Sequence, residues 1–229
     1  MFEKLTQMML TRLFVSARTN PVMMQGRGLE YVLFQYSLFP KVIVKMLTMI
    51  RDRVRQEGWI EVDRELTRNI GEELGTESDG MQHYHMLVEA LSNECGILVP
   101  GTNASKATST FISEMFALLS HENVFVSLGA VYAIETTASP ELRVVIKLIT
   151  MIRRLQGVKN PGNFGEMAKK FFEMHVCTWE PGHEEGLRTA AAPILTSPEV
   201  CAHFEQGFTV VLDTMETWWK ELALEASRF

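Results

Sequence analysis

The stretch of the chain that combines the most metal-ligand chemistry reads FFEMHVCTWEPGHEE, over residues 171–185. Its apolar residues recur at helical spacing, so it predicts an amphipathic helix that carries two histidines and several carboxylates among aromatic side chains. Glu180 and His183 form a Glu-x-x-His pair, a spacing with which helical bundles hold pairs of metal ions. The same spacing also occurs on solvated helical faces, so a metal site requires matching ligands elsewhere in the chain.

Composition places the chain among globular proteins. It has 229 residues, of which 46% are hydrophobic and 22% charged, which is enough for a substantial core and excludes a disordered chain. The net charge of -6, with no basic stripe, argues against a nucleic-acid partner. The longest apolar runs, such as 42–50 and 124–134, are too short or too interrupted to cross a bilayer, and the first ten residues lack signal-peptide features. We therefore expect a cytoplasmic protein with no membrane partner.

Helical periodicity extends along almost the whole chain, and no run alternates with period two for long enough to indicate a sheet. We therefore predict an all-α fold in one domain over residues 1–229. The expected helices cover 3–17, 29–57, 59–74, 81–94, 108–120, 122–137, 139–156, 163–192 and 197 onward, with 108–120 and 122–137 as two helices or one bent helix. Asn20-Pro21 should end the first region, and 99–103 should form a turn.

Two prolines lead to specific expectations about helix geometry. Pro40 removes a backbone donor inside the expected helix 29–57, so that helix should kink near Phe39. Ser139-Pro140-Glu141 should start a new helix, because it supplies a capping residue, a proline in the first turn and an acid near the positive end of the helix dipole.

Glu135 is the clearest candidate ligand outside the late stretch. It is the only charged residue between Glu122 and Glu141, on a helix too apolar to be exposed on all sides. A buried carboxylate needs partners, and a metal ion would supply one. The alternative is a glutamate that reaches solvent or pairs with an arginine such as Arg143.

A second set of candidates flanks the interruption at residues 75–80. Glu72 and Glu73 lie at the end of one expected helix, and His83 and His85 lie at the start of the next, so both ligand types meet at one place. Helical spacing puts His83 on the apolar face and directs His85 away from it. The alternative for the histidines is a capping or surface role.

Together, these stretches resemble the haem-oxygenase-like di-iron oxidase and oxygenase family, and the resemblance covers most of the chain. The family pattern is an acid in a Glu-Glu-x-Gly-like turn, a histidine shortly after it, a lone glutamate on a central apolar helix, and His-x-x-x-Asp-x-x-His on a late helix. The resemblance implies a haem-oxygenase-like bundle of about seven helices. It also implies two iron ions, ferrous before they react with O2 as co-substrate. The implied metal ligands are Glu73, His83, Glu135, His175, Glu180 and His183.

Within this implied set, Glu135 would bridge the two ions, and manganese would accept the same ligands as iron. The sequence departs from the family pattern in the late motif, where glutamate replaces aspartate and one extra residue separates His175 from Glu180. In a regular helix, the fifth residue past His175 points well away from it. A one-residue π-bulge would restore the facing, and Pro181 favours it because it cannot donate to the carbonyl of Cys177. We therefore predict a distorted helix between His175 and His183, with Glu72 and Glu184 as the substitute ligands for Glu73 and Glu180.

The resemblance also implies a function. Relatives oxidise small amino-acid-type or fatty-acid substrates with O2, and an external reductant can take part. Residues 29–41 resemble a cyanobacterial branch of the family that rearranges a brominated tryptophan oxidatively to an indole nitrile, so tryptophan is the expected substrate class. Tyr132, Trp179 and Phe172 are the candidate substrate-binding residues, and family habit suggests a homodimer.

Other interpretations remain open at this stage. A metal-free relative would be a thiaminase-like hydrolase with Cys177 as nucleophile, or a small-molecule binder. A non-catalytic module that binds proteins is another possibility, and an iron store is the weakest. The three cysteines, Cys95, Cys177 and Cys201, are widely spaced with no Cys-x-x-Cys, so we expect reduced, mostly buried thiols, with Cys177 in the core.

Overall fold

The computed structural model describes residues 1–15, 26–99 and 103–229, and all regular structure within these ranges is helical. The all-α prediction is thereby confirmed. The α-helices are α1 (Phe2–Val15), α2 (Gly26–Ser37), α3 (Pro40–Gln56), α4 (Ile60–Glu73), α5 (His83–Cys95), α6 (Lys106–Leu119), α7 (Val124–Leu155), α8 (Glu166–Met174), α9 (Glu180–Ala191) and α10 (Pro198–Ala226). A π-helix, η2 (His175–Trp179), joins α8 to α9, and a 3-10 helix, η3 (Ala192–Ile194), follows α9.

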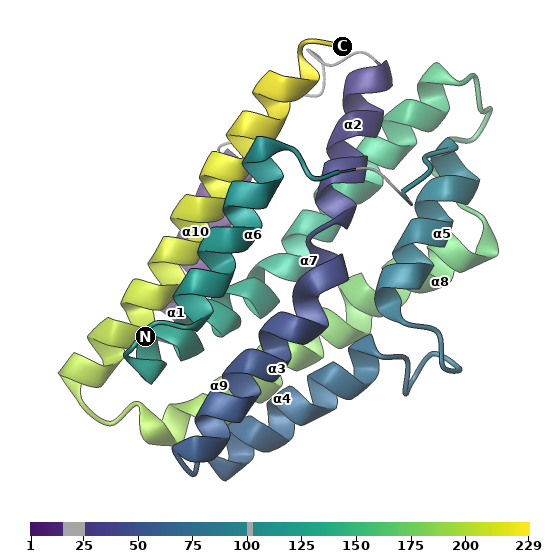
Figure 1. The fold of residues 1–229 in the computed structure, drawn as a ribbon. Helices are drawn as coiled ribbons and strands as arrows, with labels where there is room; N and C mark the ends of the chain where they lie inside the picture. Colours follow the sequence, from purple (N-terminus) through teal and green to yellow (C-terminus); the bar gives the residue numbers. More distant parts are fainter. Residues whose placement is uncertain (16–25, 100–102) are drawn as a thin grey trace.

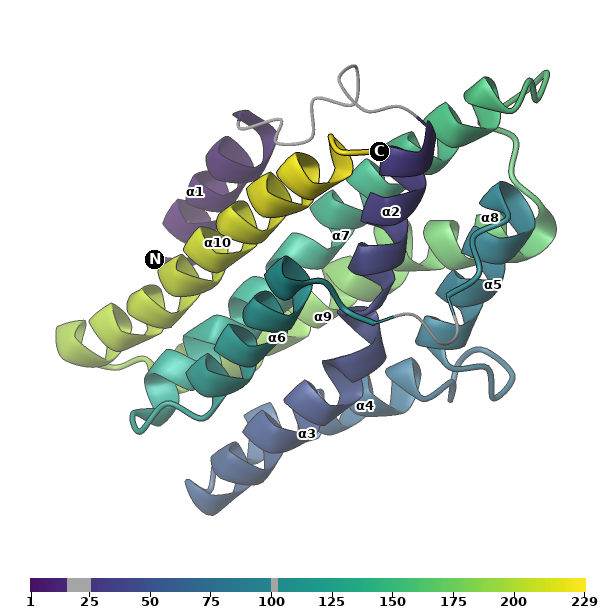
Figure 2. The same cartoon turned by 45° about the horizontal axis from the view of Figure 1, so that its top comes forward.

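The long helix α7 runs through the middle of the bundle (Figure 1). Figure 2 shows α1 and α10 on one side of it and α3 and α4 on the other. α7 packs most extensively against α10, and it also contacts α9, α2 and α5. Glycines allow the close approach of α7 and α10, because a Cβ on Gly129 would lie 1.9 Å from the carbonyl oxygen of Phe204, and one on Gly207 would lie 1.9 Å from that of Val126.

The expected kink at Pro40 is confirmed. α2 ends at Ser37 and α3 begins at Pro40, and the N–H groups of Leu38 and Phe39 bond only three residues back along the chain. The combined stretch Gly26–Gln56 has the length and hydropathy of a membrane span, but 56% of its apolar window is buried in the bundle. Core packing therefore accounts for its hydropathy.

The expected helix start at Ser139 is wrong, because α7 continues from Val124 to Leu155 with Pro140 inside it. Pro140 cannot donate to the carbonyl of Thr136, a loss that costs about 3 kcal/mol in a helix interior. Burial on both sides of the proline offsets this cost. The buried apolar residues that flank it include Val131, Ile134, Leu142, Val145, Leu148 and Ile149.

The turn between α4 and α5 depends on Gly75. Its φ of +100° is unfavourable for other residues, and a Cβ there would lie 2.7 Å from the backbone of Gly80. The N–H of Gly80 donates to the carbonyl of Gly75 at 2.9 Å, which closes the turn. The end of α4 and the start of α5 are thereby held side by side, so Glu73 and His83 come from adjoining helix termini.

Other helix boundaries agree closely with those predicted from the sequence. Ser197 caps α10 by accepting from the N–H of Val200, as expected from Ser-Pro-Glu. The expected helix 163–192 becomes α8, η2 and α9 in direct succession. The predicted end of the first helix at residue 17, the turn at Asn20-Pro21 and part of the turn at 99–103 lie outside the described residues.

The cysteines differ in part from expectation. All three are free, but only Cys95 is buried, while Cys201 is half-buried and Cys177 is exposed. Cys177 lies in η2, whose inward face is occupied by other residues, so the prediction that Cys177 belongs to the core is wrong.

Candidate metal centre

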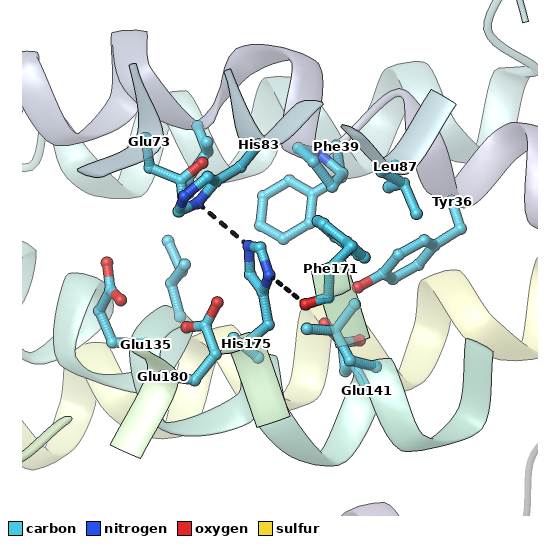
Figure 3. Close-up of a pocket in the computed structure, with 15 residues that line it drawn as sticks. Tyr36, Phe39, Glu73, His83, Leu87, Glu135, Glu141, Phe171, His175 and Glu180 are labelled. Carbon is cyan, nitrogen blue, oxygen red and sulfur yellow. Dashed lines mark hydrogen bonds and ion pairs between the residues drawn. The ribbon is translucent and has the colours of Figure 1, made fainter. Parts of the chain in front are cut away.

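The structure brings the six predicted ligands together as two groups of three. The first group contains Glu73 from α4, His83 from α5 and His175 from η2, with ligand atoms that all lie within 4.8 Å of one another. His83 Nδ1 lies 3.3 Å from a carboxylate oxygen of Glu73 and 3.0 Å from His175 Nε2 (Figure 3).

A backbone carbonyl fixes the orientation of His175. Its Nδ1 lies 2.7 Å from the carbonyl oxygen of Phe171, one helical turn earlier. A carbonyl only accepts, so Nδ1 carries the proton and Nε2 presents a lone pair to Glu73 and His83. Metal-ligating histidines are commonly held in this way through their second nitrogen.

The second group contains Glu135 from α7, Glu180 from α9 and His183 from α9, again with ligand atoms within 4.8 Å of one another. His183 Nδ1 lies 3.0 Å from Glu135 and 3.8 Å from Glu180. All three residues are buried. Glu135 therefore pairs with His183, and the alternative pairing with Arg143 is not found among the described ion pairs.

The π-helix predicted from the extra residue is confirmed. η2 covers His175–Trp179, and the N–H of Glu180 donates to the carbonyl of His175, five residues earlier instead of four. This wider turn rotates Glu180 back to the face that carries His175. Glu180 is 6% exposed and points into the interior, so the extra residue in the motif is accommodated without loss of the carboxylate.

Glu72 lies behind the second group. Its Oε2 lies 2.7 Å from His183 Nε2, the nitrogen that faces away from Glu135, and its other oxygen accepts from Arg68. Arg68 also pairs with Glu65 on α4. Sequence reasoning had placed Glu72 as a substitute ligand for Glu73, whereas the structure gives it contact with a different histidine.

Burial and charge act against each other within these groups. Burial disfavours the imidazolium of His183, but Glu135, Glu180 and Glu72 around it raise its pKa well above the ordinary value. Burial, together with the neighbouring His83, lowers the pKa of His175 to about 3. The carboxylates around His183 and the burial of His175 therefore shift the two pKa values in opposite directions.

The carboxylates show the same opposition. Burial raises the pKa of Glu180 to about 7, and Glu135 and Glu73 contribute to the rise although His183 opposes it. Burial would also raise the pKa of Glu73, but its hydrogen bond and charge interaction with His83 lower it. The pKa of Glu72 is lowered because His183 and Arg68 outweigh its burial.

The donor set fits two divalent metal ions. Three carboxylates and three imidazoles converge, and none of the three carboxylates pairs with lysine or arginine among the described residues. In addition, His83 Nε2 is buried without a hydrogen-bond partner. Buried carboxylates without a permanent cation are costly, and a bound cation removes that cost. Mixed imidazole and carboxylate ligands suit iron or manganese.

A cavity of about 60 Å³ adjoins the ligands. Glu73, His83, Glu135, His175 and Glu180 form part of its wall (Figure 3). The rest is mainly apolar and includes Tyr36, Phe39, Ile43, Leu87, Ile134, Leu142 and Phe171, with one further carboxylate, Glu141. Sequence reasoning missed Tyr36, Phe39 and Glu141 as site residues.

None of the three aromatic residues expected to bind substrate lines this cavity. Tyr132 faces away from it, packs against Phe204 and donates to Glu184 at 3.3 Å. Trp179 stacks on the ring of His83 at 4.2 Å, and so supports a ligand instead of facing the cavity. Phe172 packs against Phe164 and Phe171. The aromatic residues that do line the cavity come largely from the kink between α2 and α3.

The structure also shows where the other candidate residues from the sequence lie. Glu184, the substitute for Glu180, accepts from Tyr132 and Thr6 on the side of α1 and lies outside both groups. His85 is exposed, as expected from helical spacing. Cys177 does not line the cavity, and no histidine contacts it among the described hydrogen bonds, so the structure offers it no activating base.

The fold and the site thus define an all-α bundle with a buried histidine and carboxylate centre beside an apolar cavity. The chain belongs to the family described as "Domain of Unknown Function with solved-structure structure (DUF3865)", whose model matches residues 1–225. A crystal structure described as a CADD-like protein of unknown function from Nostoc punctiforme PCC 73102 is 35% identical, with a TM-score of 0.87, and the match covers 98% of this chain and 96% of that one. A second structure with the same description is 32% identical, with a TM-score of 0.84, and covers 98% and 94%.

A more distant relative carries an enzyme name. The chain is 25% identical over 192 residues to the 4-chloro-allylglycine synthase of Streptantibioticus cattleyicolor. The match covers 82% of this chain but 65% of the relative, so the chain corresponds to slightly less than two thirds of that enzyme's length.

Proposed function

We propose that this protein is an O2-dependent non-haem di-iron oxidase or oxygenase that acts on a small amino-acid-type substrate. The observation that carries the proposal is a pair of adjoining, largely buried groups, five of whose six residues line one cavity. The groups are Glu73, His83 and His175, and Glu135, Glu180 and His183. The weak similarity to an amino-acid-forming synthase supports the substrate class.

Each group would hold one ferrous ion. When bound, the two ions would supply the electrons with which O2 is reduced and activated for attack on the substrate. The chain contributes the geometry for this chemistry. The carbonyl of Phe171 orients His175, and the carboxylate of Glu72 orients His183, each through the second nitrogen of the ring. The apolar wall formed by residues such as Phe39 and Leu142 limits the access of water.

The cavity restricts the substrate. At about 60 Å³ it has space for a few water molecules, which matches a side chain of a few carbon atoms.

Conversion of a brominated tryptophan to an indole nitrile is the finer candidate. Its support is that Tyr36, Phe39 and Pro40, within the stretch that resembles the nitrile-forming branch, line the cavity. Tryptophan and its halogenated forms are therefore the first substrates to test, and smaller amino acids form the second group.

The test loads the purified protein with ferrous iron under anaerobic conditions, counts iron per chain and records O2 consumption on addition of each amino acid. We expect two irons per chain and faster O2 consumption with at least one amino acid. His83→Ala should abolish this response, whereas His85→Ala, which removes an exposed histidine from the same helix, should leave it intact.

A wild-type chain that retains no iron and shows no response to O2 would contradict the proposal and favour a metal-free hydrolase or binding module. A response to smaller amino acids but not to tryptophan would overturn only the nitrile-forming candidate. We also propose that the protein is a cytoplasmic homodimer, and gel filtration would test its oligomeric state. We propose further that it draws electrons from an external reductant, which a screen of reductants would test.

A further inference from the structure

Glu141 is a buried carboxylate that the proposed di-iron centre does not use. It lies on α7, six residues past Glu135, is 3% exposed and belongs to the wall of the cavity. Figure 3 shows it on the opposite side of His175 from Glu135. The Cα atoms of Glu135 and Glu141 are separated by about 9 Å along the helix axis, so the cavity has a metal-ligand end and a separate acidic end.

The carboxylate of Glu141 lacks a cationic partner. Its Oε1 accepts from the indole N–H of Trp219 at 2.6 Å, and this is its only hydrogen bond among the described residues. It forms no ion pair among those residues either. Burial raises the pKa of Glu141 to about 7, and the bond from Trp219 only partly opposes the rise.

A structural role alone accounts poorly for this arrangement. The Trp219 N–H needs an acceptor, but a neutral amide such as glutamine would satisfy it at a lower desolvation cost than an ionisable carboxylate. A buried, unpaired acid in a cavity instead indicates a group that awaits a ligand.

The surroundings of Glu141 favour a cation of small size. Tyr36, whose hydroxyl points toward Glu141 in Figure 3, and Phe171 contribute aromatic rings to the same part of the cavity. Aromatic rings attract ammonium groups electrostatically, and the apolar wall strengthens the attraction between opposite charges. The small cavity favours a primary ammonium over a guanidinium.

We propose that Glu141 is the residue that binds the ammonium group of the substrate, and so selects amines and orients the carbon chain toward Glu135, Glu180 and His175. This inference rests on the proposed function for the identity of the substrate. The ammonium site itself is a property of the cavity and can be measured without iron.

The test compares two probes of similar size, n-butylammonium and 1-butanol, by ligand-observed NMR titration of the metal-free and the ferrous-loaded protein. The wild type should bind the ammonium at least about ten-fold more tightly than the alcohol, as expected for a hydrogen bond to a charged group. Glu141→Gln should reduce this ratio to about one, and Glu141→Asp should retain part of it. Glu114→Gln, which removes an exposed charge on α6, is the matched control and should leave the ratio unchanged.

A wild-type ratio of one, or an unchanged ratio in Glu141→Gln, would overturn the ammonium site. If Glu141→Gln fails to fold by circular dichroism, Glu141→Met replaces it as the charge-free variant. A high ratio without amino-acid-triggered O2 consumption would support the ammonium site while contradicting the proposed function. Equal amino-acid-triggered O2 consumption by the wild type and Glu141→Gln would support the proposed function while overturning the ammonium site.

Discussion

Glu72 Oε2 lies 2.7 Å from His183 Nε2, while the other nitrogen of the same ring lies 3.0 Å from Glu135. A carboxylate can only accept, so Glu72 keeps a proton on Nε2, and a metal ion bound at Nδ1 would take the place of the proton shared with Glu135. Arg68 holds Glu72 in turn. The chain therefore places a supporting carboxylate directly before a proposed ligand carboxylate, Glu73, on the last turn of α4.

The first prediction concerns this supporting contact. Glu72→Gln keeps the shape of the side chain but weakens its bond to His183, so ferrous affinity at the group of Glu135, Glu180 and His183 should fall about 10–100-fold. Stepwise anaerobic iron titration should show one weakened and one unchanged binding step. Glu89→Gln, at an exposed position on α5, is the control. Two unchanged steps in Glu72→Gln would show that the contact does not support a metal site.

The second prediction concerns the π-helix. Insertion of one alanine after Cys177 adds a second extra residue to η2, which should rotate Glu180 and His183 by about 100° relative to His175. Iron should fall from two ions per chain to one or none, while circular dichroism still reports a helical protein. Cys177→Ala removes only an exposed side chain and should retain both ions. Full iron binding by the insertion variant would mean that the length of η2 does not aim Glu180.

The third prediction concerns the crossing of α7 and α10. In Gly129→Ala the new methyl group would lie 1.9 Å from the carbonyl oxygen of Phe204, so the helices must separate, at a cost of about 1–3 kcal/mol. Urea unfolding of the metal-free protein measures the change. Gly182→Ala in α9 meets no atom within 4 Å and should instead stabilise the protein by about 0.5–1 kcal/mol, because alanine favours helix. Equal effects of the two substitutions would contradict the close packing.

The sequence was sufficient to predict most of the helices and the π-helix, because each of these features has a local signal, whereas the set of six ligands was implied by the family resemblance. Apolar spacing marks the helices, Glu135 is a lone charge on an apolar helix, and the extra residue before Glu180, together with Pro181, marks the π-helix. These signals lie in neighbouring residues, so they can be recognised without knowledge of the tertiary structure.

The features that the sequence did not predict depend on contacts between distant helices. Pro140 and Glu141 together resemble a helix start, yet packing on both sides keeps α7 continuous and buries Glu141 against Trp219 of α10. Likewise, Tyr132 and Tyr36 are both aromatic residues on apolar helices, and only the way the helices are rotated in the bundle decides which one lines the cavity. Spacing within one helix carries no information on that rotation.

The last prediction follows from the burial of Glu141. Burial raises the pKa of Glu141 from its ordinary 4.5 to about 7 in the folded protein. Between these values the folded protein binds more protons than the unfolded chain, so the Glu141 carboxyl makes folding less favourable as the pH rises. The full penalty, present above the folded pKa, is roughly 3 kcal/mol, and it is absent below the unfolded pKa.

Glu141→Gln removes the ionisation but keeps an acceptor for Trp219, so the metal-free variant should be more stable than the wild type at about pH 8. The difference in unfolding free energy should shrink as the pH falls through about 7 and should be small near pH 5, because the wild-type carboxyl is then protonated in the folded state. Urea unfolding of both proteins across this range measures it, with Glu114→Gln as the exposed control. A difference that is independent of pH would mean that Glu141 is solvated or already paired. Its carboxylate would then carry no cost in folding free energy, and that cost could not be cited in favour of a ligand-binding role.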